Sequence, residues 1–281
     1  ITEAYTLAKD AHEGQYRKSG EPYITHPLHV AKYLAEIGMD EETVIAAILH
    51  DVIEDTSTKL TTIKKKFGKD VGLIVDGVTK LDKINFSTNE EAQAESIRKM
   101  VIAMSKDVRV LILKLADRLH NIETIQSLPE WKQQNIASET LYVYSPLAHR
   151  LGLQNVKHKL EDKSFSILFP QQDDEISNQV SSTLPDRKKA INKTKKIIDN
   201  LLSDNSISAE VSGRPKHNYS IYKKIINNGL SFTEINDLIG IRIICSDVSE
   251  CYTILGLIHA NFQPVQGRFK DFISMPKFNL Y

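Results

Sequence analysis

Four ionisable side chains stand close together at the end of one apolar stretch. In AAILHDVIEDT, residues 46–56, His50 and Asp51 are adjacent, and Glu54 and Asp55 follow one helical turn later. If the segment is a helix with about 100° per residue, the polar groups share one side and the apolar residues the other. A solvated helix face would give the same separation. The adjacent His-Asp pair favours a metal site, because it offers an imidazole nitrogen and a carboxylate oxygen to one ion.

Two other segments could complete such a site. His26 precedes Pro27, which can begin a helix and so place the imidazole at a fixed helix start. Asp117 interrupts the apolar segment LILKLADRLHNIETI, where a buried carboxylate without a partner would be costly. His26 could instead be an ordinary turn histidine, and Asp117 could pair with a neighbouring arginine. As a set with His50 and Asp51, these nitrogen and oxygen ligands suit Mn²⁺, Fe²⁺ or Zn²⁺ better than Ca²⁺ or a thiolate zinc site.

The elements that must position these residues are expected to be helices. Apolar residues have mostly helical spacing from residue 1 to about 169, which predicts an all-α first domain over 1–169. The polar stretch 170–185 is expected to be a linker region. From 186 to 281 the pattern changes: β-type runs ISAEVSG, DLIGIRIICSD and HANFQPVQGRFKDF alternate with helical SIYKKIINN and SECYTILGLIHA. This alternation predicts a mixed α/β second domain.

Composition sets broad limits. The 281 residues suffice for about two domains, and 41% of them are hydrophobic. Lys plus Arg equals Asp plus Glu at 36 each, so no net field draws the whole chain to nucleic acid or to an anionic membrane. The two cysteines form no CxxC pair, and neither a signal-peptide pattern nor an apolar run of about 18 residues is present. A cytoplasmic location is expected, and the chain is expected to be a fragment of a longer protein.

Longer motifs around these residues resemble a known family. The spacing of His26, His50-Asp51 and Asp117 resembles the HD phosphohydrolase superfamily. The strings AHEGQYRKSGEPYITHPLHVA, HDVIEDT and KLADRLHN are similar to the hydrolase domain of long RelA/SpoT homologues, the stringent-response enzymes. GRPKHNYSIYKK, DLIGIRIIC and GRFKDFISMPKFNLY are similar to the synthetase domain of the same proteins, in the same order. The resemblance implies an all-α HD-type domain followed by a mixed α/β, nucleotidyltransferase-like synthetase domain that is incomplete at its C-terminal end.

For the first domain, the resemblance implies Mn²⁺-dependent removal of pyrophosphate from the 3′ position of ppGpp or pppGpp, which gives GDP or GTP. The metal ligands would be His26, His50, Asp51 and Asp117. Glu54 and Asp55 would orient the attacking water or assist proton transfer, with solvation of a helix end as their alternative role. The nucleotide would be contacted by Arg17, Lys18, Ser19, Asn121 and Thr124. Arg17 would stack on guanine, whereas an ordinary surface role for Thr124 stays open. Because the chain keeps the HDxxED string, a competent hydrolase is expected.

For the second domain, the resemblance implies transfer of the β,γ-pyrophosphate of ATP to the 3′-hydroxyl of GDP or GTP. Asp237 would be the catalytic Mg²⁺ ligand, with an ordinary strand-end aspartate as the alternative. The nucleotides would be contacted by Arg214, Lys216, Arg268, Lys270, Lys277 and Tyr281; for the first two, a solvated basic loop is the alternative. In the family, the pattern continues past this tyrosine to a second catalytic glutamate. The chain as given is therefore expected to hydrolyse (p)ppGpp without effective synthesis.

Two further functions stay open. An HD phosphohydrolase could act on another nucleotide, such as a deoxynucleoside triphosphate or a cyclic dinucleotide, although the synthetase-like half would then be unexplained. Alternatively, the chain could be a regulatory module that senses guanine nucleotides, with reciprocal coupling between its two domains. Ribosome and transfer-RNA contacts belong in this family to C-terminal regions absent here, so neither is assigned to this chain. No membrane partner is expected.

Overall fold

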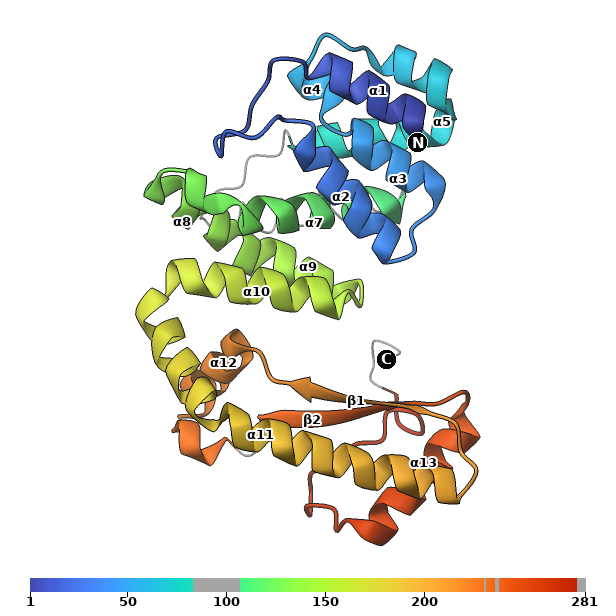
Figure 1. Cartoon of the computed structure of the whole chain (residues 1–281), viewed down its shortest axis with the longest axis vertical. Coiled ribbons are helices and arrows are strands. Elements are labelled where there is room, and N and C mark those ends of the chain that lie inside the picture. The colour runs from blue at the N-terminus through green and yellow to red at the C-terminus, as the bar shows by residue number, and fades with distance from the viewer. Residues whose placement is uncertain (83–106, 230, 236–237, 277–281) are drawn as a thin grey trace. The chain divides into compact units, whose positions relative to one another are not determined.

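The computed structural model describes residues 1–82, 107–229, 231–235 and 238–276, except the side chains of 183–185, 187, 214–215 and 233. The chain divides into two compact units, Ile1–Gln171 (unit 1) and Gln172–Tyr281 (unit 2). Unit 1 is built of helices, and unit 2 combines helices with a small sheet (Figure 1), which confirms the predicted fold class. Over the described residues, none of the helices is both long enough and apolar enough to cross a membrane.

Unit 1 begins with three helices, followed by one short turn of helix. These are α1 (Thr2–Ala11), α2 (Thr25–Glu36), α3 (Glu41–Leu49) and α4 (Val52–Asp55). The rest of unit 1 comprises α5 (Leu60–Asp82), α7 (Val108–Glu123), η1 (Ile125–Ser127), α8 (Glu130–Glu139), the π-helical η2 (Thr140–Tyr144), α9 (Ser145–Arg150) and α10 (Gln154–Leu168).

The core of unit 1 forms around α3. This helix is apolar on nearly every side, and Ala46, Ala47 and Leu49 are fully buried in it. It packs against α1, α2, α5 and α7, as expected for a helix without a polar face. Because α7 also packs against α2 and α5, the three helices α2, α3 and α7 meet around one small volume.

Two aspartates begin the central helices. Asp40 accepts a hydrogen bond from the Thr43 backbone N–H at the start of α3, and Asp107 accepts one from the Arg109 backbone N–H at the start of α7. Each bond satisfies an N–H that lacks a partner in the first helical turn. The Arg109 guanidinium contacts Asp107 at 2.7 Å and Asp40 at 2.9 Å. One side chain thus joins the first turns of α3 and α7.

The sequence analysis treated the HDxxED segment as one continuous helix, but the structure divides it in two. α3 ends at Leu49, a turn covers residues 50–51, and α4 begins at Val52. The reason is local: Nδ1 of His50 lies 2.7 Å from the Ala47 carbonyl oxygen, the group that the N–H of residue 51 would bond in a continuing helix. Side-chain bonds of this kind compete with the helix ladder.

Unit 2 contains a long helix and a two-stranded antiparallel sheet. α11 (Pro170–Asp204) precedes β1 (Glu210–Pro215), α12 (Asn218–Asn228), η3 (Phe232–Glu234), β2 (Ile239–Ile244) and α13 (Val248–Asn261). β1 pairs with β2 from Glu210↔Ile244 to Pro215↔Ile239. A small core forms from Ile198, Leu202, Val211 and Ile254, so α11 and α13 both pack on the sheet. Residues 170–185, placed in a linker region by the sequence analysis, form the first part of α11.

The third predicted β run, HANFQPVQGRFKDF, is wrong as a strand. Its first residues end α13, and the remainder has turns and bends without a strand. Gly267 has a φ of 72°, and the Arg268 N–H donates to the Val265 carbonyl at 3.0 Å. A turn closed by a left-handed glycine, together with Pro264, interrupts the extended conformation that a strand requires.

Candidate metal centre and its cavity

Two histidine nitrogens and two carboxylates converge between α2, α3 and α7. His26 Nε2 lies 3.1 Å from Asp117 Oδ1 and 3.6 Å from Asp51 Oδ2. His50 Nε2 lies 3.1 Å from Asp51 Oδ1 and 4.0 Å from Asp117 Oδ1. Ligand atoms of His26, His50 and Asp117 all lie within 4.8 Å of one another. The structure therefore brings together the four residues that the sequence analysis selected as metal ligands.

The four residues meet because α2, α3 and α7, which position them, pack against one another. His26 is in the first turn of α2, His50 and Asp51 follow the end of α3, and Asp117 is in the middle of α7. Both histidines and Asp117 are buried, and Asp51 is partly exposed, with 18% of its side chain accessible. Three ligands are thus fixed by the core, and the fourth faces outward.

The protonation of His50 suits a metal ligand. Its Nδ1 is 2.7 Å from the Ala47 carbonyl, and a carbonyl can only accept, so Nδ1 carries a proton and the lone pair of the neutral ring lies on Nε2. Nε2 is buried and makes no hydrogen bond within the described part of the chain. A buried acceptor without a donor, facing carboxylates, is costly unless a cation satisfies it. The donor set therefore fits a divalent ion with mixed nitrogen and oxygen ligands.

Asp117 stays ionised although it is buried. Burial by itself would raise its pKa, but the Lys114 ammonium 2.7 Å away holds the pKa well below its usual value. Asn121 also donates to Asp117 Oδ1 at 2.6 Å. The partner of Asp117 on its own helix is thus a lysine, not the arginine considered from sequence. Burial acts to lower the pKa of His50, but the nearby Asp51 and Asp117 carboxylates raise it above its usual value.

Tyr23 holds Asp51 from the loop before α2. Its hydroxyl donates to Asp51 Oδ2 at 2.9 Å, and its ring stacks on His12 at a centroid distance of 4.6 Å. Burial raises the pKa of Tyr23, and the Asp51 and Asp55 carboxylates raise it further, so the hydroxyl stays a donor. Sequence reasoning missed Tyr23, although it stands three residues before His26 in the EPYITHP string.

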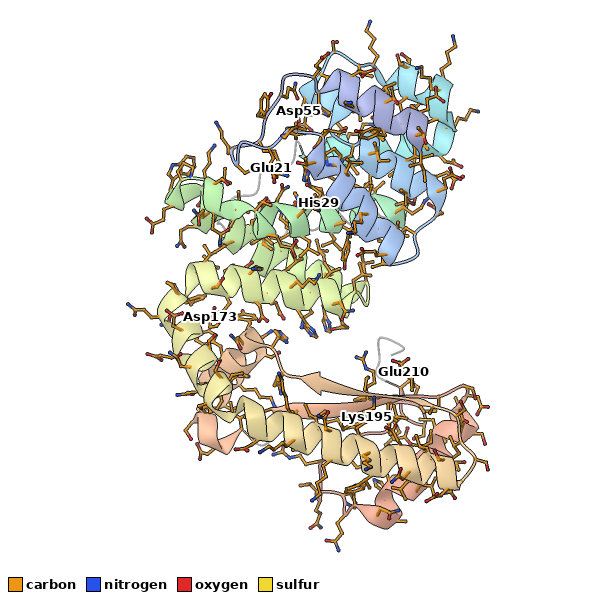
Figure 2. All side chains as sticks on the ribbon, viewed as in Figure 1. Glu21, His29, Asp55, Asp173, Lys195 and Glu210 are labelled. Carbon is orange, nitrogen blue, oxygen red and sulfur yellow. The ribbon has the colours of Figure 1, made fainter. Side chains whose placement is uncertain are left out.

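A cavity of about 670 Å³ opens from the metal centre. Glu54 and Asp55 line it, and Figure 2 labels Asp55 at the end of α4. The other residues assigned to the hydrolase site from sequence line the cavity too, with the exception of the buried His50. The lining residues are Arg17, Lys18, Ser19, His26, Asp51, Asp117, Asn121 and Thr124. The loop between α1 and α2 therefore faces α7 across the cavity.

Arg17 reaches across this cavity to the end of α7. Its guanidinium contacts His120 Nδ1 at 3.0 Å, Asn121 Oδ1 at 3.0 Å and Thr124 Oγ1 at 3.3 Å. Desolvation, followed by the neighbouring His26 and Arg17, lowers the pKa of His120 to about 3. His120 is therefore neutral at physiological pH. It was not selected from sequence, but it stands one helical turn after Asp117, on the same side of α7.

The wall opposite the loop carries a second ion pair that sequence reasoning also missed. Arg118 NH2 donates to Glu139 Oε2 at 2.8 Å, and the guanidinium lies 4.1 Å from the centre of the Tyr144 ring. Both Arg118 and Glu139 line the cavity, as does Lys114. Tyr144 is buried within π-helical η2, which begins directly after Glu139. π-helical segments of this kind often occur at functional sites.

The residues expected to form the synthetase site are described only in part. Lys216 donates its backbone N–H to the Leu238 carbonyl at 3.1 Å, and Arg268 and Lys270 are exposed. The backbone of Arg214 pairs with Gly240 in the sheet, but its side chain lies outside the described residues. Asp237, Lys277 and Tyr281 also lie outside them. This site therefore stays a prediction.

Two family models match the chain. A model described as an HD domain matches residues 4–154, which include the metal centre and every residue around the cavity. A model described as a region found in RelA / SpoT proteins matches residues 213–281. The first match covers the greater part of unit 1, and the second lies within unit 2.

Curated relatives match over the full length of the chain. It is 53% identical over 281 residues to a GTP pyrophosphokinase of Streptomyces antibioticus and 48% identical over 281 residues to the bifunctional (p)ppGpp synthase/hydrolase SpoT of Escherichia coli K12. It is 46% identical over 286 residues to a guanosine-3′,5′-bis(diphosphate) 3′-pyrophosphohydrolase of Aquifex aeolicus. All of this chain is covered in each case, but it spans only 33%, 40% and 40% of the respective relatives.

Proposed function

The chain belongs to the HD domain family and carries a RelA/SpoT region after it, and from this premise we propose that unit 1 hydrolyses (p)ppGpp in a reaction that depends on a divalent cation. The products would be pyrophosphate and GDP or GTP. Among relatives that match the whole chain, one is named for this hydrolysis and another for both hydrolysis and synthesis. We further propose Mn²⁺ as the metal, because the mixed set of two imidazoles and two carboxylates suits this class of ion.

One observation carries the proposal: the ligand set His26, His50, Asp51 and Asp117 lies at the inner end of a cavity with cationic and polar side chains on its walls. A substrate with two diphosphate groups needs a cation at the phosphorus that is attacked. It also needs positive charge around the remaining phosphates. The cavity supplies the second feature with Arg17 and Lys18 on the loop and Lys114 and Arg118 on α7.

The proposed reaction is a hydrolysis that consumes one water molecule. The water oxygen attacks the phosphorus bonded to the 3′-oxygen of the ribose, the bond to that oxygen breaks, and the 3′-oxygen gains a proton. When bound, a divalent cation lowers the pKa of water and offsets charge on the phosphoryl oxygens. Glu54 and Asp55 line the cavity beyond the ligands, where we propose that they orient the water and accept its proton.

Recognition of the nucleotide is assigned to the loop and to the end of α7. Arg17 has a planar guanidinium that can stack on a purine, and Lys18 offers a point charge for phosphate. Ser19, Asn121 and Thr124 line the same part of the cavity and offer hydrogen-bonding groups to base and sugar. We propose that these five residues select a guanine nucleotide.

The test is release of pyrophosphate and GDP from ppGpp by the purified chain with Mn²⁺, with Mg²⁺ alone and after chelation. We expect turnover that requires Mn²⁺ and is abolished in His50→Ala. Because His50 is buried and its loss could unfold the domain, Asp51→Asn, at a partly exposed position, is the second variant. Asp76→Asn is the matched control, since the ion pair that Asp76 forms among the described residues is with the surface residue Lys80, at 2.6 Å.

Each outcome has a definite meaning. Turnover after complete chelation, or undiminished turnover in folded Asp51→Asn, would refute a metal-dependent reaction at this centre. Hydrolysis of dGTP in place of ppGpp would support an HD phosphohydrolase of another nucleotide. Binding of ppGpp and Mn²⁺ without turnover would support a nucleotide-sensing module.

For unit 2 we propose that in the longer protein it transfers pyrophosphate from ATP to GDP or GTP, as the name of the Streptomyces relative implies, and that the chain as given carries out this transfer without effective turnover. The proposed Mg²⁺ ligand is Asp237, and Lys216, Arg268 and Lys270 would contribute positive charge. The measurement is formation of ppGpp from ATP and GDP with Mg²⁺. Its dependence on Asp237→Asn distinguishes catalysis at this site from a contaminating activity.

A further inference from the structure

His26 and His120 share a short contact between like atoms. Their Nδ1 atoms lie 2.8 Å apart, so one nitrogen must carry a proton and the other a lone pair. The rings are tilted at 43°, with centroids 4.9 Å apart. The location of this proton decides whether Nε2 of His26, which faces Asp117 and Asp51, can bind a cation.

Arg17 resolves the direction of this hydrogen bond. NH1 of Arg17 lies 3.0 Å from the same His120 Nδ1, and a guanidinium is always a donor. Nδ1 of His120 is therefore the acceptor for both neighbours. It follows that His26 carries a proton on Nδ1 and donates it to His120, so the lone pair of the neutral His26 ring lies on Nε2. The opposite assignment would place two N–H groups against each other.

The same arginine also orients a second ligand. NH2 of Arg17 donates to Asn121 Oδ1 at 3.0 Å, so the Asn121 amide nitrogen points the other way and donates to Asp117 Oδ1 at 2.6 Å. One guanidinium from the loop thus fixes two α7 side chains, and each of these contacts a metal ligand.

We propose that His120 is a positioning residue for the metal centre: as an acceptor fixed by Arg17, it holds the proton of His26 on Nδ1 and so presents Nε2 to the cation. The inference rests on the proposed metal-dependent function but concerns metal binding itself. In this arrangement His120 accepts a hydrogen bond from Nδ1 of His26, just as the Ala47 carbonyl accepts one from Nδ1 of His50. Such partners set the tautomer and orientation of metal-binding histidines.

Two substitutions separate the acceptor from the bulk of the ring. His120→Phe keeps a flat ring against His26 but removes the acceptor. His120→Asn places an amide oxygen near the position of Nδ1 and keeps the acceptor. His29→Phe is the matched control, because His29 stacks on His120 with centroids 4.9 Å apart and is exposed on α2, where Figure 2 labels it.

The experiment measures the Mn²⁺ dissociation constant of the full chain without nucleotide, from the electron paramagnetic resonance signal of free Mn²⁺. We expect an increase of about 10- to 100-fold for His120→Phe, the usual effect of losing an outer partner. We expect less than about a 3-fold change for His120→Asn and none for His29→Phe. Circular dichroism checks that each variant is folded. The activity of His120→Phe relative to wild type should be higher at saturating Mn²⁺ than at limiting Mn²⁺, because excess metal compensates for weaker binding.

A second readout reports the tautomer directly. In the metal-free chain labelled with ¹⁵N-histidine, the His26 signals, identified by their loss in His26→Gln, should be those of the Nδ1–H form. In His120→Phe the Nε2–H form should become populated. If His120 served only to pack against His26, the His26 signals would be the same in His120→Phe and in the wild type.

Several results would overturn the inference. These are a wild-type Mn²⁺ affinity in folded His120→Phe, an equal loss in His120→Asn, an Nε2–H tautomer in the wild type, or no Mn²⁺ binding by the wild type. Failure of the proposed function gives a different result: Mn²⁺ binds and responds to these substitutions, but ppGpp is not hydrolysed.

Discussion

At the residue scale, the centre depends on groups that determine where the protons of its ligands lie. His50 donates to the Ala47 carbonyl, Asp51 accepts from the Tyr23 hydroxyl, and Asp117 accepts from Lys114 and Asn121. His50 and Asp51 thus each have one atom engaged by the protein and another that faces the site, whereas both oxygens of Asp117 accept hydrogen bonds. Bonds of this kind reduce the freedom of the ligands before a cation arrives, which favours binding.

Tyr23→Phe should reduce kcat for ppGpp by about 10-fold and lower the free energy of unfolding by no more than the value of one hydrogen bond. The substitution removes the hydroxyl that donates to Asp51 Oδ2 at 2.9 Å but keeps the ring that stacks on His12. Loss of one hydrogen bond costs about 0.5–1.5 kcal/mol of folding free energy. Steady-state kinetics and urea unfolding give the two values.

Tyr33→Phe is the control for this prediction, because it makes the same chemical change on α2 away from the cavity. It should leave kcat unchanged. Equal loss of activity in both variants, or full activity in both, would show that the hydrogen bond from Tyr23 to Asp51 does not support catalysis.

At the scale of elements, the site depends on how α3 and α7 are held together. α3 ends at the His50-Asp51 turn, and α7 carries Asp117, so a shift between the two helices would separate the ligands. Arg109 joins their first turns through Asp40 and Asp107. Close packing of α5 on α7 supports the same arrangement from another side.

Arg109→Met should lower the free energy of unfolding by about 1–2 kcal/mol at pH 7, because two helix-capping aspartates lose their charged partner. Hydrogen bonds with Arg109 help to lower the pKa of Asp107 from its usual 3.8, and a hydrogen bond from Thr43, assisted by Arg109, lowers that of Asp40. Since these folded-state pKa values lie below the unfolded ones, the stabilisation is present above about pH 4 and lost as the pH falls through the folded values.

The measurement is urea unfolding of wild type and Arg109→Met at pH 7 and at pH 3. The difference between them should shrink at the lower pH. A deficit that is equally large at both pH values would show that packing of the arginine, and not its charge, is what matters.

Gly77→Ala should destabilise unit 1 by about 1–3 kcal/mol through overpacking. Gly77 lies in α5 against α7, and a Cβ there would come within 2.7 Å of Val110 Cγ2. Gly256→Ala, in α13, is the matched substitution: its Cβ would meet nothing within 4 Å, so it should stabilise by about 0.5–1 kcal/mol through helix propensity. Thermal unfolding gives both values; stabilisation by Gly77→Ala would contradict the close approach of α5 and α7.

At the scale of the whole molecule, the two units differ in how much of a site each contains. All the residues that line the large cavity, and all four proposed metal ligands, belong to unit 1. Over the described residues, the core cluster of unit 1 is extensive, whereas the cluster around Ile198 in unit 2 contains four buried residues. Hydrolysis should therefore need nothing from unit 2.

A fragment of residues 1–171 should fold alone and hydrolyse ppGpp with kcat and KM within about 3-fold of those of the whole chain, because every side chain of the proposed centre is inside it. Mn²⁺-dependent assays on the two proteins check this. A folded fragment with a much higher KM would mean that unit 2 contributes to nucleotide binding, and one with no kcat would mean that unit 2 controls the active conformation.

The sequence by itself determined the fold class and selected the four residues that converge. His26, His50-Asp51 and Asp117 are separated by long segments, but each motif puts an ionisable group on an apolar helix, and such groups need partners. Helical periodicity is a local property, so it can be seen in one chain without a structure. The same reasoning could not find the break between α3 and α4, which results from a single side-chain bond to Ala47, or the turn that replaces the third strand.

Only the tertiary structure decided which groups touch. Tyr23, Lys114 and His120 stand near the proposed ligands in sequence, but their spacing alone does not show that each of them contacts one. The contact between Arg17 and His120 joins residues 103 positions apart. The direction of a hydrogen bond depends on every neighbour of its two atoms at once, and those neighbours come together only when α2, α3, α7 and the loop before α2 are packed.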